Sequence, residues 1–158
     1  MTTLTVLLWT AFFSFLPISE LRGGIPFAIV NNIPWYAAWP FAAACNALVA
    51  PVCWVFLSTL HKLFLKMSWY EKFFTRFIGR AREKLSPGIN KYGALGIAVF
   101  VAIPLPITGA WTGTLGAWVL NVQKRKTMLA VILGVAISGG IVTAVMVLGI
   151  SALNIFLK

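Results

Sequence analysis

Acidic and metal-binding side chains are scarce in this sequence. Its 158 residues include three acidic residues, one histidine and two cysteines, and only 10% of the residues are charged. The apolar stretches contain no nucleophile with a neighbouring base, no cluster of metal ligands and no glycine-rich phosphate loop. Cys45 and Cys53 both fall in the apolar run 36–60, where a free thiol packs as a small hydrophobic group. We therefore expect no enzyme, no cofactor, no metal site and no disulfide.

Apolar residues make up 60% of the chain, and the mean hydropathy is +0.92. A soluble domain has about 45–50% apolar and 25% charged residues. Long apolar stretches cover almost the whole length, at 4–19, 25–60, 93–120 and 127–157. No basic segment precedes the first of them, so we do not expect 1–19 to be a cleaved signal. The sequence predicts one integral membrane domain, residues 1–158, with no separate soluble domain.

The basic residues are concentrated in two connecting segments. Of the thirteen lysines and arginines, eight lie in 62–91 and three in 124–126. Basic loops stay on the cytoplasmic side of a membrane protein. This placement predicts a multi-pass protein of the cell membrane with cytoplasmic loops at 62–91 and 121–126. It argues against nucleic acid as the partner of the positive charge.

The apolar segment between these loops, 93–120, must leave the membrane on the side from which it entered. Pro104 and Pro106 interrupt it, because each proline removes a backbone donor and clashes with the preceding turn. Each half then has about 13 residues, roughly 20 Å of helix, while the hydrocarbon core is about 30 Å thick. We expect a re-entrant helical hairpin whose tip is buried in protein or lines a water-filled cavity.

The N-terminal segment repeats this pattern. A shift of 89 positions aligns "LPIS" (16–19) with "LPIT" (105–108) and gives seven identities over positions 16–32. The predicted fold is therefore all-α, with two repeats (4–60 and 93–157) joined by a linker (62–91). Each repeat is a re-entrant hairpin followed by a transmembrane helix, 35–60 or 127–157. Because 35–60 crosses once, the second repeat is inverted relative to the first, as in many secondary transporters.

The linker contains an amphipathic pattern. Aromatic and aliphatic residues recur at helical spacing through 66–85, with lysines and arginines on the opposite face. Such a helix lies on a leaflet that contains anionic lipids. We expect this role in preference to a site for a specific protein partner.

The first tip, "LPISELRGGIP" (16–26), places Glu20 and Arg22 within the bilayer, where a charge costs about 2.5–3.5 kcal/mol on insertion scales. The two side chains could neutralise each other or cap helix ends. Glu20 would then lie near the start of a half-helix that begins after Gly23 and Gly24, with Pro26 in its first turn. Alternatively, Glu20 binds a proton or cation, while Arg22 and free backbone amides at the tips hold an anionic group.

The second tip, "PLPITGAWTG" (104–113), carries no charge. Thr108 is a candidate N-cap, and Thr108, Thr112 and the glycines could offer hydroxyls and close backbone approach to a ligand. Trp111 would be a wall or a gate, and plain helix packing is the alternative. The candidate site comprises Glu20, Arg22, Gly23, Gly24, Pro26, Pro104, Pro106, Thr108, Gly109, Trp111 and Thr112.

Two segments, "ELRGGIPFAI" (20–29) and "KYGALGIAVFVAIPLPITGAWTGTLGAWVL" (91–120), resemble the putative small multidrug export protein family over nearly the whole chain. That family is in turn similar to the DedA and VTT proteins, which share paired re-entrant hairpins and include proton-linked lipid-carrier transporters and scramblases. The resemblance implies a transporter-like fold in which Glu20 and Arg22 are the acidic and basic residues of the first hairpin.

These features predict a secondary transporter or flippase, proton-coupled, for a small amphipathic or lipid-linked anion bound at the two tips. An energy-independent lipid scramblase and a structural or assembly protein are the alternatives. Because so few helices must shield two hairpins from lipid, we also expect a homodimer or a larger homo-oligomer.

Overall fold

The computed structural model describes residues 2–60, 74–76, 79, 83, 92–105 and 108–156. Most of the predicted amphipathic helix 66–85, the rest of the linker and Pro106 lie outside these residues. The described residues form helices and no strands, which confirms the all-α prediction. The helices are α1 (Thr3–Phe15), α2 (Glu20–Val30), α3 (Trp35–Ala47), α4 (Val49–Thr59), α7 (Ala94–Ala102), α8 (Ala110–Val119) and α9 (Lys124–Phe156).

Two helical stretches are long and apolar enough to cross a membrane. Helices α3 and α4 together give 25 residues, Trp35–Thr59, and α9 gives 28 residues, Lys124–Ser151. At 1.5 Å per residue these stretches are about 37 Å and 42 Å long, against a hydrocarbon core of about 30 Å. The other described helices have 9 to 13 residues, so none of them can cross alone. The two candidate spans coincide with the predicted transmembrane helices.

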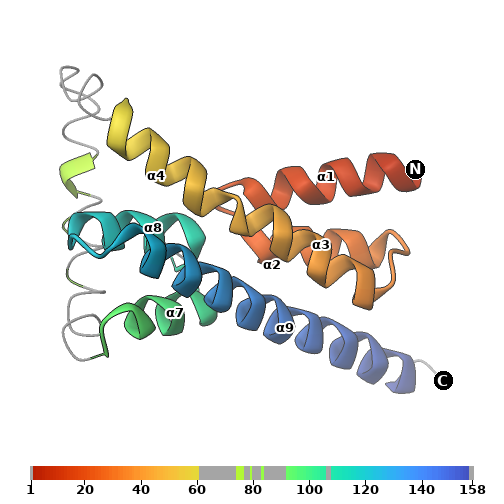
Figure 1. Ribbon diagram of the computed structural model, residues 1–158. Helices are drawn as coiled ribbons and strands as arrows, with labels where there is room; N and C mark the ends of the chain where they lie inside the picture. Colours follow the sequence, from red (N-terminus) through yellow and green to blue (C-terminus); the bar gives the residue numbers. More distant parts are fainter. Residues whose placement is uncertain are drawn as a thin grey trace.

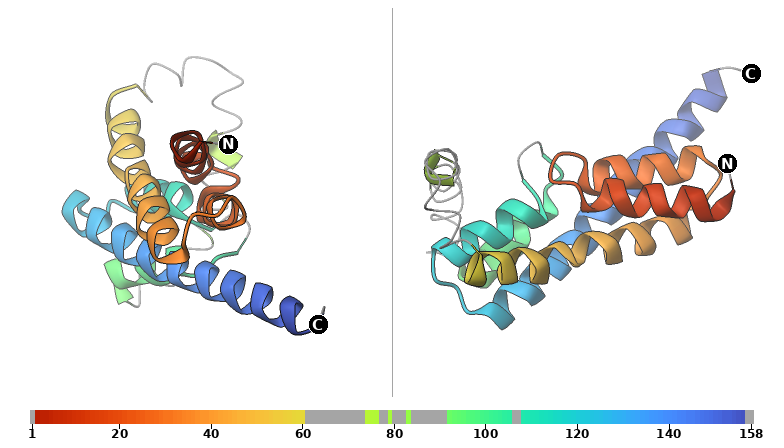
Figure 2. Two further views of the ribbon diagram at one scale, coloured as in Figure 1. Left: turned by 90° about the vertical axis from the view of Figure 1, so that its right-hand side faces the viewer. Right: turned by 90° about the horizontal axis from the view of Figure 1, so that it is seen from above.

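The short helices form two pairs that lie on either side of the crossing long helices. Figure 1 shows α1 and α2 toward one end of the molecule and α7 and α8 toward the other, with the turn of each pair near the middle. The view from above in Figure 2 gives the same arrangement. Helix α2 contacts both α3 and α9, and α8 contacts both α4 and α9, so each pair packs against the long helices of both halves.

The helix ends recur at the spacing of the sequence identities. Helix α2 ends at Val30 and α8 ends 89 residues later at Val119, while α3 begins at Trp35 and α9 begins 89 residues later at Lys124. The turns that follow α2 and α8 are also alike. Asn32 and Asn121 take positive φ angles of 65° and 54°. The next amides, those of residues 33 and 122, donate to the carbonyls of residues 28 and 117 at 3.0 and 2.9 Å. Both are the left-handed helix ends that asparagine tolerates.

Apolar side chains cover the outside, and polar ones lie within. The exposed large side chains include Leu4, Leu8 and Phe12 of α1 and Leu129 and Ile132 of α9. The buried polar side chains are Thr10, Ser14, Glu20, Asn46, Thr112, Thr114, Thr127, Ser138 and Thr143. Soluble proteins show the opposite preference, whereas membrane helices pack through small and polar residues and expose apolar ones to lipid. The chain is a membrane protein.

Helix α9 approaches α7 at Gly134, and this contact yields a stability prediction. A Cβ atom there would lie 2.6 Å from Val101 Cβ and 2.7 Å from the Ala98 carbonyl oxygen. We expect Gly134→Ala to lower the free energy of unfolding by about 1–3 kcal/mol through overpacking. Gly149→Ala is the matched control, because nothing lies within 4 Å of a Cβ at that position of the same helix. Thermal unfolding in detergent measures both, and equal melting temperatures would contradict the α7–α9 contact.

Candidate functional site

The tips of the two helix pairs meet at Glu20. Its side chain is 6% exposed, and its Oε1 accepts a long hydrogen bond of 3.5 Å from the backbone N–H of Trp111 in the first turn of α8. The first amides of a helix lack partners within the helix and carry partial positive charge. Gly109, the N-cap residue of α8, has no side chain to satisfy them. A carboxylate from the other pair therefore caps α8.

Gly109 leaves the space that this carboxylate occupies. A Cβ atom at Gly109 would lie 2.6 Å from Glu20 Oε1 and closer still to Oε2, so any side chain would overlap the carboxyl group. The φ angle of Gly109 is 151°, a conformation that side chains disfavour. Glycine at this position thus meets both a backbone and a packing requirement.

Trp111 makes the reverse connection, from the second tip to the first. Its indole Nε1–H donates to the Phe15 carbonyl at 2.8 Å, and the two rings pack edge to face with centroids 5.6 Å apart. Phe15 is the last residue of α1, where carbonyl groups lack helical donors. Each tip therefore satisfies backbone groups at a helix end of the other, and Trp111 forms a wall of the contact.

The backbone of Glu20 is itself unusual. It has a φ angle of 46°, in the left-handed region that costs a non-glycine residue about 1–2 kcal/mol. Such strain persists only where the surrounding structure imposes it, and it is typical of functional sites. The conformation places the carboxyl group of Glu20 against α8 as soon as α2 begins.

Arg22 follows Glu20 by two residues and is half-buried. Residues i and i+2 lie on different faces of a helix, and the two side chains form no direct ion pair, although the arginine charge acts on the carboxylate through space. Of the two structural alternatives, mutual neutralisation by contact is absent and helix capping is observed.

The predicted start of the half-helix after Gly24 was wrong. Helix α2 begins at Glu20, and Pro26 lies inside it rather than in its first turn. Because Pro26 has no N–H, the carbonyl of Arg22 has no helical donor.

The glycines of the first tip serve packing. A Cβ atom at Gly24 would lie 3.1 Å from the Thr10 carbonyl oxygen and would overlap the hydroxyl of Ser14, both on α1. A Cβ atom at Gly23 would lie 2.7 Å from Ser19 Cβ. Gly24 therefore allows α1 and α2 to approach closely, while Gly23 leaves room for Ser19, the N-cap residue of α2. They are not turned toward the contact between the tips.

Thr108 is not the N-cap of α8, contrary to the sequence prediction. The hydroxyl of Thr108 lies 2.7 Å from the Ile103 carbonyl and 2.8 Å from that of Leu105, and it accepts the Leu105 N–H at 3.1 Å. It therefore holds the irregular segment after α7, which includes half-buried Pro104, instead of capping α8. Thr112 is buried and donates to the Gly109 carbonyl at 3.3 Å. Its hydroxyl stabilises the first turn of α8.

The sequence analysis missed polar residues in the interior. Asn46 of α3 is 1% exposed and donates through Nδ2 to the Ser14 carbonyl at 2.6 Å, which joins α3 to α1. Among the described residues, Asn46 Oδ1, Ser14 Oγ and Thr114 Oγ1 are buried without a hydrogen-bond partner. The sequence did contain a signal for this contact, because Asn46 lies in the middle of an apolar run. An amide side chain is costly in lipid, so such a residue is expected to face the protein interior.

The fold and these contacts define the class: an all-helical membrane protein with an apolar outer surface and an acidic side chain buried where two helix tips meet. Residues 20–141 match the family described as Putative small multi-drug export protein. The chain belongs to this family, which confirms the resemblance carried by the two tip motifs. The family is one of export and membrane transport rather than an enzyme class. No match was found among curated proteins or among solved structures.

Proposed function

We propose that this protein is a proton-coupled secondary transporter or flippase, with the tips of two re-entrant hairpins forming the site. The capping of α8 by the buried carboxylate of Glu20 is the observation that carries the proposal. In bilayers a buried carboxylate is expensive, and such residues mark ion and proton pathways.

Three features support an inverted-repeat architecture. The two helix pairs point toward each other from opposite ends of the molecule (Figure 1), and α3–α4 and α9 run in opposite directions between those ends. The helix ends recur at an offset of 89 residues. Transporters built from inverted repeats bind substrate near the midplane, with the N-termini of broken helices directed at anionic groups. The N-terminus of α8 is such an end.

Proton coupling follows from competition for the amides of α8. The ionised carboxylate of Glu20 occupies them, in the position that a substrate anion would take. Protonation removes its negative charge and weakens its attraction to the helix end. The amides then become available to a substrate anion, and the charge of Arg22 nearby favours its entry. A proton and an anion would thus bind together.

The substrate class follows from the surroundings. An anionic headgroup would meet the amides of α8 and Arg22, while an apolar body would remain among the apolar side chains that cover the protein. A small amphipathic or lipid-linked anion has both parts. The second tip contributes no positive side chain, so recognition of the anion rests on Arg22 and on backbone amides.

Glu20→Gln tests the proposal in proteoliposomes, with a fluorescent short-chain phosphatidic acid as the probe and an imposed pH gradient as the driving force. We expect the gradient-driven rate to fall about tenfold or more, because a charge-assisted hydrogen bond of about 1.5–3 kcal/mol and the proton carrier are both lost. Glu83→Gln, which neutralises an exposed carboxyl group, is the matched control and should keep the wild-type rate.

The same assay separates the alternative functions. Equal probe movement in wild type and Glu20→Gln, with no need for a gradient, would indicate a scramblase and reject proton coupling at Glu20. No movement in either protein, with a folded and inserted chain, would reject transport of this anion class.

A further inference from the structure

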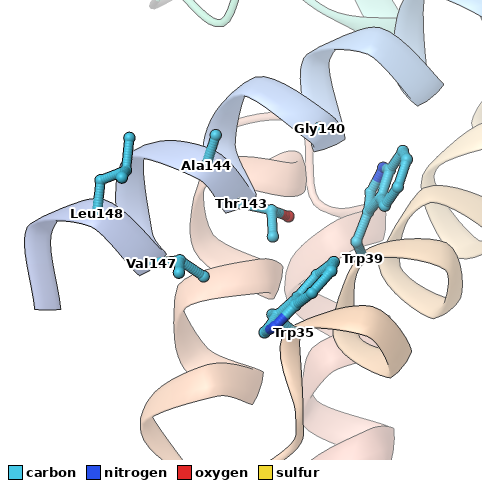
Figure 3. Close-up of a pocket in the computed structure, with 7 residues that line it drawn as sticks. All are labelled: Trp35, Trp39, Gly140, Thr143, Ala144, Val147 and Leu148. Carbon is cyan, nitrogen blue, oxygen red and sulfur yellow. The ribbon is translucent and has the colours of Figure 1, made fainter. Parts of the chain in front are cut away.

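A second site lies away from the tips, between α3 and the second half of α9. A cavity of about 330 Å³ is bounded by Trp35 and Trp39 on one side and by Gly140, Thr143 and Ala144 on the other, and Val147 and Leu148 extend it (Figure 3). It shares no residue with the contact between Glu20 and Trp111. Its volume falls within the range of about 300–1,000 Å³ that is usual for small-molecule sites.

Trp39 is a fixed wall of this cavity. Its Nε1–H donates to the Ala136 carbonyl at 3.2 Å, so its polar edge is satisfied by α9. A Cβ atom at Gly139 would lie 2.6 Å from the indole Cδ1, so the indole packs directly on the backbone of α9 there. One hydrogen bond and one close contact therefore hold the ring in place, with its apolar surface along the cavity.

The two indoles also line a second cavity. A further cavity of about 290 Å³ is also lined by Trp35 and Trp39, together with Tyr36, Pro40, Ala43 and Ala136. Trp35 is 50% exposed. Aromatic faces bind other rings at centroid distances of about 4.5–7 Å, and such pairs are favourable beyond the area they bury. These indoles offer that surface to a ligand.

Thr143 provides a polar group that a ligand could bind. It is 5% exposed, and its hydroxyl has no hydrogen-bond partner. Figure 3 shows this hydroxyl on the α9 side of the cavity, pointing toward the side on which the two indoles lie. A buried hydroxyl without a partner is unfavourable, so a ligand that offers a donor or an acceptor at this point gains affinity. A lipid tail would fill the apolar volume but would leave the hydroxyl unpaired.

We propose that this cavity binds a planar aromatic amphiphile that enters from the bilayer. Its rings pack against Trp35 and Trp39, and its polar group forms a hydrogen bond with Thr143. The small residues Gly140 and Ala144 form the floor, because larger side chains on this face of α9 would fill the space for the rings.

N-phenyl-1-naphthylamine is a suitable probe because it has two aromatic groups and one N–H donor. Its binding to the purified full chain in detergent is followed by energy transfer from tryptophan. Ala144→Phe fills the cavity and should weaken saturable binding by about tenfold or more. Val145→Phe is the matched control on the next, exposed residue of α9, outside the cavity lining, and should bind as wild type does.

Thr143→Val tests the polar contact with almost no change of shape. We expect about fivefold weaker binding, the effect of one neutral hydrogen bond of about 1 kcal/mol. The variant should fold at least as well as wild type, because it removes a buried hydroxyl that has no partner. Reduced binding would then not be attributable to misfolding.

Three results would overturn the proposal. Energy transfer that rises without saturation would show only partition of the probe into detergent. Equal binding by Ala144→Phe and Val145→Phe would place the probe elsewhere. The third result concerns lipids with brominated acyl chains in bilayers. If such a lipid displaces the probe, and if it quenches tryptophan fluorescence equally in wild type and Thr143→Val, the occupant is a lipid tail.

Discussion

Gly109→Ala should abolish gradient-driven transport and lower the free energy of unfolding by about 2 kcal/mol or more. The added Cβ would overlap the carboxyl group of Glu20, and alanine disfavours the φ angle of 151° found at this position. The carboxylate would have to leave the N-terminus of α8. Thermal unfolding in detergent and the proteoliposome assay measure the two effects.

A matched glycine separates the overlap from the backbone strain. Gly93 also has a positive φ angle, 59°, but nothing lies within 4 Å of a Cβ built on it. Gly93→Ala should therefore lower the free energy of unfolding by only about 1–2 kcal/mol, and the variant should retain transport. The excess loss in Gly109→Ala reports the contact with Glu20, and it should shrink when Glu20→Ala is added. If Gly109→Ala behaves like Gly93→Ala, the carboxyl group of Glu20 does not lie at α8.

Sequence reasoning located the helices because their limits depend on local properties. The apolar runs 35–60 and 127–157 were predicted to be crossing helices in this way, and they overlap the candidate spans Trp35–Thr59 and Lys124–Ser151. Prolines predicted the interruption of 93–120 in the same manner, since a missing donor acts within one turn. The structure ends α7 at Ala102, two residues before Pro104.

Sequence reasoning failed where a distant segment decides the local structure. Proline is common in the first turn of a helix, so Pro26 favoured a half-helix that begins after Gly24. Helix α2 instead begins at Glu20 in a left-handed conformation, and the carboxyl group meets the first amides of α8, 91 residues away. Rules that depend only on neighbouring residues in the sequence cannot predict that contact. Gly109 leaves the space for this same carboxyl group, so its packing role could not be predicted from its neighbours in the sequence either.

The second prediction with a large expected effect concerns the side of the membrane on which each connecting segment lies. In a protein with Cys45 and Cys53 replaced, single cysteines at Tyr92 and Gln123 flank α7 and α8, and one at Asn31 follows α2. We expect a membrane-impermeant maleimide to label Asn31→Cys in intact cells. Tyr92→Cys and Gln123→Cys should react only after the membrane is opened. Labelling of all three in permeabilised cells controls for access to each site.

Labelling of Tyr92→Cys and Gln123→Cys from opposite sides would mean that 93–120 crosses the membrane. Helices α7 and α8 have 9 and 10 residues, about 29 Å if they were continuous, so length alone would allow a crossing. The irregular backbone that follows Ala102 opposes it, because irregular backbone at membrane depth is tolerated only where it is buried in protein or lines a water-filled cavity. A crossing would remove the inverted arrangement and leave the contact between Glu20 and α8 as a structural cap. Labelling from one side would leave the two tips facing each other across the membrane interior, where a proton-dependent carboxylate can control access to an anion site.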